Sequence, residues 1–79
     1  MATDQKNNEK LDLAKNYVLS NNYSEALELF KELDDDDAKN SEIKLLFGIT
    51  LLRSENYQEA IRVLSEAIKI QPDILMLIK

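Results

Sequence analysis

The side chains that could carry out chemistry are few, because the chain contains no histidine and no cysteine. Histidine is the commonest general base and metal ligand, and cysteine supplies thiolate nucleophiles, metal sites and disulfides. The serines therefore lack a histidine partner. The single glycine, Gly48, lies in an apolar run that predicts a helix, not in a phosphate-binding loop. We expect neither enzymatic activity nor a bound cofactor or metal.

Four consecutive aspartates, Asp34 to Asp37, are the densest group of possible ligands. Calcium-binding loops place their ligands at alternate positions around a glycine. Here the carboxylates are adjacent and no glycine is near, so the run predicts a solvated acidic loop. Tyr23 and Tyr57 occupy equivalent places in a repeated motif, which favours packing at a helix junction over catalysis.

Size and charge narrow the classes of partner. The chain has 79 residues, enough for one domain, of which 44% are hydrophobic and 32% charged. Its net charge of −5 opposes the phosphate neutralisation that nucleic-acid binding requires. The N-terminus lacks the apolar core of a secretory signal, and no apolar stretch is long enough to span a bilayer. We expect a soluble, cytoplasmic protein that binds neither nucleic acid nor membrane.

The chain matches itself when it is shifted by 34 residues. The hexapeptide 22–27 aligns with the hexapeptide 56–61. Other residues identical at this offset are Lys10 and Lys44, Leu11 and Leu45, Ser20 and Ser54, and Glu32 and Glu66. A fixed period of this length is typical of repeat proteins, in which each unit buries its apolar face on its neighbour. The sequence predicts two copies of one unit and a function in binding.

Apolar residues at spacings of three and four predict four helices, at about 8–21, 23–33, 42–54 and 57–70. Asn22 and Asn56, each followed three residues later by glutamate, predict capping boxes, and Ser41 predicts the N-cap of the third helix. The aspartates oppose the helix dipole, so the second helix should end at Leu33. Pro72 blocks extension of the fourth. The predicted fold class is all-α, with two tandem antiparallel helical hairpins.

Residue size alternates in the way that close helix packing requires. Small residues at 14/48 and 26/60 allow two helices to approach, and bulky residues at 17/51 and 30/64 fill the space around them. A glycine inside a helix costs about 1 kcal/mol relative to alanine, so Gly48 should have a packing reason. Ala67 should likewise lie under a neighbouring helix.

The whole pattern resembles the tetratricopeptide repeat, a helix-turn-helix unit of 34 residues, over residues 7–40 and 41–74. The second unit resembles the family at Phe47, Gly48, Leu51, Asn56, Tyr57, Ala60, Leu64, Ala67 and Pro72, and the first at Leu13, Ala14, Tyr17, Asn22, Tyr23, Ala26 and Phe30. The resemblance implies an α-solenoid fragment with a polar lead at 1–7, repeats at 8–40 and 41–74, and a further helix start or docking segment at 75–79. Lys10 and Lys44 depart from the family, which often has tryptophan there.

In such repeats the first helix of each unit lines a concave face. The residues expected on this face are mostly apolar, with two cations: Leu11, Lys15, Val18, Leu19, Leu45, Leu46, Ile49, Leu52 and Arg53. The resemblance implies a non-catalytic protein-protein interaction module that holds a peptide or partner protein here, with Lys15 and Arg53 steering acidic groups. The alternative is that the leucines are ordinary core. The clamp that some members use for acidic chaperone tails is not expected, because Leu11 and Leu46 occupy two of its positions.

The last apolar residues, Ile74 to Ile78, lie where a further helix would begin. A solenoid ordinarily closes with a polar capping helix, because its last repeat otherwise exposes an apolar side. We therefore expect either a fragment of a longer repeat array or a chain that self-associates as a homodimer. The residues expected to make the self-association contact are Ile74, Leu75, Leu77 and Ile78.

Overall fold

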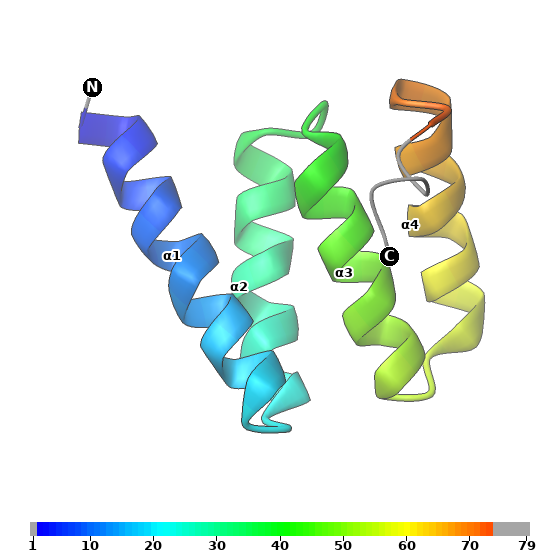
Figure 1. Cartoon of the computed structure of the whole chain (residues 1–79), viewed down its shortest axis with the longest axis horizontal. Helices are drawn as coiled ribbons and strands as arrows, with labels where there is room; N and C mark the ends of the chain where they lie inside the picture. The colour runs from blue at the N-terminus through cyan, green and yellow to red at the C-terminus, as the bar shows by residue number, and fades with distance from the viewer. Residues whose placement is uncertain (1, 74–79) are drawn as a thin grey trace.

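The computed structural model describes the backbone of residues 2–73 and the side chains of residues 8–73 (Figure 1). The described residues fold into four α-helices without a strand, which confirms the all-α prediction. The helices are α1 (Ala2–Leu19), α2 (Tyr23–Asp36), α3 (Ser41–Arg53) and α4 (Tyr57–Ile70). The expected bounds of α3 and α4 agree to within one residue, whereas α1 begins six residues before the expected start at residue 8.

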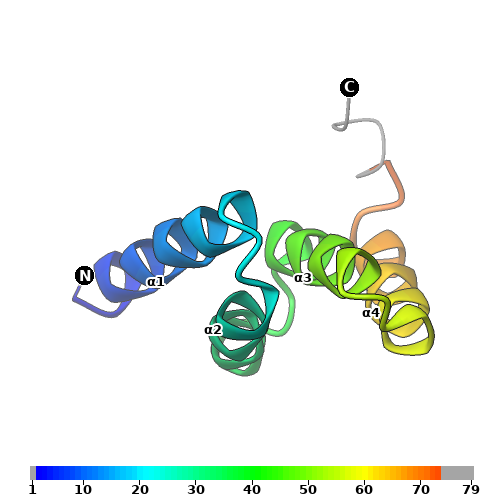
Figure 2. The same cartoon turned by 90° about the horizontal axis from the view of Figure 1, so that it is seen from below.

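The helices form two layers of antiparallel hairpins. Figure 2 shows α1 and α3 in one layer and α2 and α4 in the other. Each helix packs on the helix that follows it in the chain, so α2 contacts both α1 and α3. The contact between α2 and α3 joins the two hairpins, and it is the contact that a tandem repeat requires.

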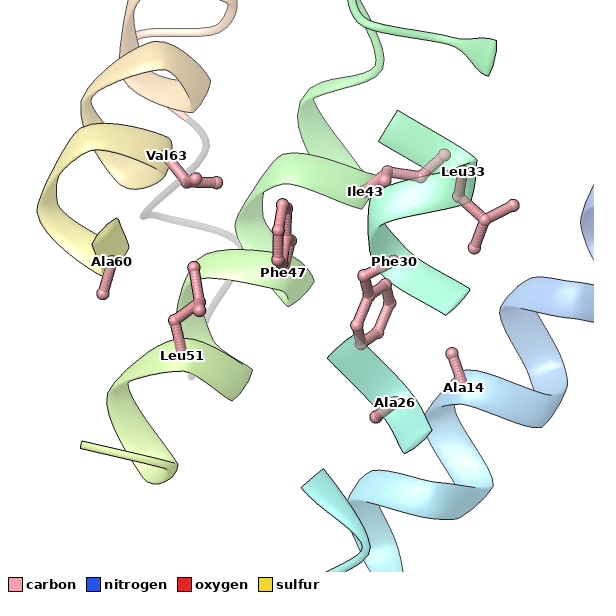
Figure 3. Close-up of a cluster of buried hydrophobic side chains, with 9 residues drawn as sticks. All are labelled: Ala14, Ala26, Phe30, Leu33, Ile43, Phe47, Leu51, Ala60 and Val63. Carbon is pink, nitrogen blue, oxygen red and sulfur yellow. The ribbon is translucent and has the colours of Figure 1, made fainter. Parts of the chain in front are cut away.

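The core lies between the layers and is continuous across the two repeats (Figure 3). At its centre the rings of Phe30 and Phe47 stack, with centroids 6.3 Å apart and planes 24° from parallel. One ring comes from α2 and the other from α3, so this pair is the apolar centre of the joint between the hairpins. The buried cluster consists of Ala14, Ala26, Phe30, Leu33, Ile43, Phe47, Leu51, Ala60 and Val63.

The expected alternation of small and bulky residues is present in the core. Ala14, Ala26 and Ala60 are completely buried, and Ala67 is buried under α3 beside Leu45. A Cβ atom built on Gly48 would lie 2.5 Å from Cγ and Cδ2 of Leu64 on α4. This contact is the packing reason for a glycine in the middle of α3.

Both hairpin turns use the same backbone device. After α1, the N–H of Asn22 donates to the carbonyl of Tyr17 (2.7 Å) and the N–H of Asn21 to that of Val18 (3.0 Å). The second turn repeats both bonds 34 residues later, through Asn56 and Glu55. This pair of bonds is the Schellman motif, which needs one residue with a positive φ. That residue is Asn21 (φ 64°) in the first turn and Glu55 (φ 67°) in the second.

The predicted capping boxes are absent. Asn22 and Asn56 precede their helices as expected, but neither side chain accepts a capping hydrogen bond. Their ψ angle of 68° departs from the extended backbone of an N-cap, because the same residue closes the Schellman motif of the preceding helix. Two helices joined so closely share this residue, and the backbone of the first helix determines its conformation.

The third helix is capped one residue earlier than expected. The N-cap is Asn40, whose Oδ1 accepts from the N–H of Ile43 at 3.1 Å, and Ser41 is the first helical residue. The hydroxyl of Ser41 donates instead to Oε1 of Gln71 at 2.7 Å, which ties the start of α3 to the end of α4.

The aspartate run does not end α2 at Leu33. The helix continues to Asp36, and Asp37 is its C-cap. Asp34 is held by Nζ of Lys44 at 2.9 Å, which neutralises the carboxylate nearest the core, and the next three aspartates are exposed to water. The repulsion expected from the sequence is thus relieved by a cation from the next helix.

We predict that Gly48→Ala lowers the free energy of unfolding by about 1–3 kcal/mol, because overpacking against Leu64 outweighs the helix propensity of alanine. Urea denaturation followed by circular dichroism measures this change. In a Leu64→Ala background the space is open, and the same substitution should stabilise by up to about 1 kcal/mol. Stabilisation in the unaltered chain would contradict the packing explanation.

We also predict that Glu55→Asn raises the free energy of unfolding by about 0.5–1 kcal/mol, because asparagine tolerates a positive φ better than glutamate. Glu55→Gln removes the same charge without this preference and serves as the control in thermal denaturation. Equal effects of the two substitutions would show that charge, not backbone conformation, governs this turn.

Candidate functional site

A groove of about 350 Å³ opens between α1 and α3. It is lined by Lys15, Val18, Leu19, Phe30, Leu46, Ile49, Thr50 and Arg53. Six of the nine residues expected on the concave face are among these eight. The apolar leucines and isoleucine of that prediction are thus partly accessible from outside the core, on the layer that holds α1 and α3 (Figure 2).

Helical spacing brings the lining residues together. On α1 they lie at positions 15, 18 and 19, and on α3 at positions 46, 49, 50 and 53, which are spacings of three and four on one side of each helix. Phe30 of α2 lies beneath the gap and is fully buried, so it closes the floor. The groove exists because α1 and α3 both pack on α2 without filling the space between them.

The groove has an apolar floor and a cationic rim. The hydroxyl of Thr50 donates to the carbonyl of Leu46 at 2.8 Å, so it is satisfied within α3 and offers no polar group to a ligand. Leu19 is 81% exposed at the edge. The two charged residues that line the groove, Lys15 on α1 and Arg53 on α3, are both positive.

The other three predicted residues lie elsewhere. Leu11 is half-buried against the main core, and Leu52 is exposed on α3 outside the groove lining. Leu45, expected on the concave face, is only 7% exposed and packs with Ala67 of α4. Its neighbour Leu46 lines the groove because successive helical residues differ by about 100° around the axis. The prediction for Leu45 was wrong, because α3 is a middle helix that is covered on two flanks.

The four residues expected to mediate self-association, Ile74, Leu75, Leu77 and Ile78, lie outside the described residues, as does the segment 75–79. Within residues 2–73, no helix is both long and apolar enough to cross a membrane. The side chains described by the structure include no group of three or more acidic residues placed to hold a metal ion.

Comparison with protein families decides the relationship. A family model described as tetratricopeptide repeat matches residues 10–77, which includes both hairpins and the groove between them. The chain belongs to the tetratricopeptide repeat family. Members of this family generally mediate protein-protein interactions and are typically non-catalytic. Comparisons with curated proteins and with solved structures find no match.

The two lysines that depart from the tetratricopeptide pattern form ion pairs in equivalent places. Lys10 of α1 pairs with Glu32 of α2 at 3.3 Å, and Lys44 of α3 pairs with Glu66 of α4 at 2.9 Å. Both pairs span 22 residues within a hairpin. The identity of these lysines and glutamates at the repeat offset was a usable signal in the sequence, although the pairing itself was not predicted.

Lys44 does more than its counterpart, because it also reaches across the joint between the repeats. It is 5% exposed, and its ammonium group contacts Asp34 of α2 as well as Glu66 of α4, each at 2.9 Å. The second carboxylate oxygen of Glu66 accepts from Arg62 at 2.9 Å. A buried cation without such partners would be strongly destabilising. The network therefore connects three helices through one side chain.

The pKa values in this network shift in the direction that the contacts require. Burial alone lowers the pKa of Lys44, but hydrogen bonds to Asp34 and Glu66 outweigh burial and raise it above its ordinary value of 10.5. The hydrogen bond from Lys44, with a further contribution from Arg62, lowers the pKa of Glu66 below 4.5. Both groups are therefore held in their charged forms at neutral pH.

The pH dependence of stability should report this network. The folded pKa of Glu66 lies below its unfolded value of 4.5, so its stabilising contribution is present above that pH and is lost as the pH falls through the folded pKa. Lys44→Met removes the main cause of the shift. The free energy of unfolding of this variant should fall less steeply below about pH 4.5 than that of the unaltered chain.

Lys10→Met is the matched control, because Lys10 makes the equivalent pair but lies nearer to water. Chemical denaturation at a series of pH values compares the three proteins. The same acid slope for Lys44→Met and the unaltered chain would contradict the role assigned to Lys44.

Proposed function

We propose that this chain is a non-catalytic protein-binding module that holds a peptide segment of a partner protein in the groove between α1 and α3. The observation that carries the proposal is an open apolar groove bounded by two cations. Apolar grooves between helices recognise amphipathic helices or extended segments whose side chains enter the groove. The family relationship supports the same class of function.

The charges at the groove favour an acidic peptide. The chain as a whole carries a net charge of −5, yet both charged lining residues, Lys15 and Arg53, are positive. They come from different helices, α1 and α3, so the groove presents a cation from each of the helices that form it. Such charges act mainly on association rate and specificity, whereas the apolar floor supplies most of the affinity. The expected ligand is apolar at its centre and carries aspartate or glutamate nearby.

A displayed library of random dodecapeptides provides a defined test. We expect the selected peptides to combine apolar residues with acidic ones, and we expect each synthesised peptide to lose at least tenfold in affinity for the Leu19→Glu/Ile49→Glu variant. Both substitutions place a carboxylate in the groove, where it costs apolar contact and repels acidic ligands. Fluorescence anisotropy at two salt concentrations measures the affinity, which should fall with added salt.

Ile61→Glu is the matched control, because Ile61 is an exposed isoleucine on α4, away from the groove. Its affinity for the selected peptides should equal that of the unaltered chain, and circular dichroism verifies that both variants retain their helices. Failure to select peptides, or equal binding by the groove variant, would overturn the proposed function.

A further inference from the structure

The outer side of α4 carries an exposed apolar stripe. Tyr57, Ile61 and Ile68 lie on one side of the helix at spacings of four and seven, and all three are exposed, with Ile61 at 63%. None of them belongs to either core cluster. Three exposed apolar groups on one side of a helix are more than isolated surface hydrophobics, and they mark a possible contact.

The repeat offset shows what this side of the helix contacts elsewhere in the molecule. In the first repeat, the equivalents of Ile61 and Ile68 are Leu27 and Asp34 on α2. Leu27 packs against the main core, and Asp34 pairs with Lys44 of α3. The α4 stripe is therefore equivalent to the side of α2 on which the next hairpin stacks.

The opposite end of the molecule exposes the complementary side. Leu13 of α1 is the equivalent of Phe47 of α3, which stacks on Phe30 of α2 and is only 3% exposed. Leu13 is 44% exposed and belongs to neither core cluster. Each end of the described fold thus displays one half of the contact that joins the two hairpins internally.

We propose that a second copy of this chain stacks its α1 on the α4 of the first, head to tail, and so reproduces the contact between α2 and α3. Leu13 of one copy then faces the stripe that contains Ile61 and Ile68 of the other. The argument rests on continuity with the internal joint, which has the same helix order and register. It is independent of the peptide groove.

The six residues after Asp73 do not suffice to cover the stripe. As a helix they would extend about 9 Å, whereas the stripe from Tyr57 to Ile68 extends about 16 Å along α4. A helix with the length of α1 covers it fully. The stack between copies should be weaker than the internal joint, because Ile68 stands where Asp34 binds Lys44 internally. The ammonium group of Lys10 in the next copy therefore finds no carboxylate at this position.

A contact between two different surfaces does not close on itself unless its rotation forms a ring, so it generates open chains. Analytical ultracentrifugation from about 10 μM to about 1 mM covers the range expected for a small interface. The weight-average mass should rise with concentration and pass beyond that of a dimer. A monomer throughout this range, or a mass that stops at the dimer, would overturn the proposal.

Two substitutions at opposite ends give a sharper test. Leu13→Glu blocks the α1 side and Ile61→Glu blocks the α4 side, so each variant alone should remain monomeric. Each retains the side that the other lacks, and an equimolar mixture should therefore form a heterodimer and nothing larger. Failure of the mixture to dimerise would contradict a head-to-tail contact.

Leu19→Glu is the control, because Leu19 is a more exposed leucine that lies in the groove. This variant should associate like the unaltered chain, and its failure to do so would place the contact at the groove and overturn the proposal. Circular dichroism establishes that all variants retain their helices. Peptide binding is unaffected by Leu13→Glu if the two surfaces are distinct, so failure of one proposal can be told from failure of the other.

Discussion

The structure depends on the contact between α2 and α3. A single helical hairpin of this length has too little interior to cover its apolar side, and small domains bury a low fraction of their surface. The stacking of Phe30 on Phe47 gives the two hairpins one common core. The groove follows from the same contact, because α3 is held beside α1 by the helix on which both of them pack. The candidate binding site is thus a product of the joint between the repeats, and neither repeat alone contains it.

Lys44 determines how this joint is aligned. An apolar residue in its place would bury comparable area without the cost of desolvating a charge, so the lysine is a poor means of gaining stability alone. Its two carboxylate partners come from different helices, Asp34 from α2 and Glu66 from α4. A shift of α3 by one turn would separate the ammonium group from both of them. The cost of an unpaired buried charge therefore disfavours other registers, which apolar contacts alone discriminate weakly.

The 34-residue offset was sufficient to predict the helices, their pairing and most of the groove, because these depend on apolar spacing that both copies share. What it could not predict depends on contacts between segments. The capping boxes fail because the turn gives Asn22 and Asn56 to the preceding helix. The extension of α2 through the aspartates requires a cation that arrives from α3. The burial of Leu45 depends on the position of α4, which periodicity within one helix does not specify.

Stacking of copies, as proposed, would also extend the candidate binding surface. The groove between α1 and α3 takes Val18 and Leu19 from the first helix, and their equivalents on α3 are Leu52 and Arg53. Leu52 is exposed on the described fold, although its counterpart Val18 lines a groove. A further α1 placed beside α3 would give Leu52 the surroundings that α3 gives Val18, and so would create a second groove. In that arrangement the exposed Leu52 is a lining residue whose opposite wall is supplied by the next copy.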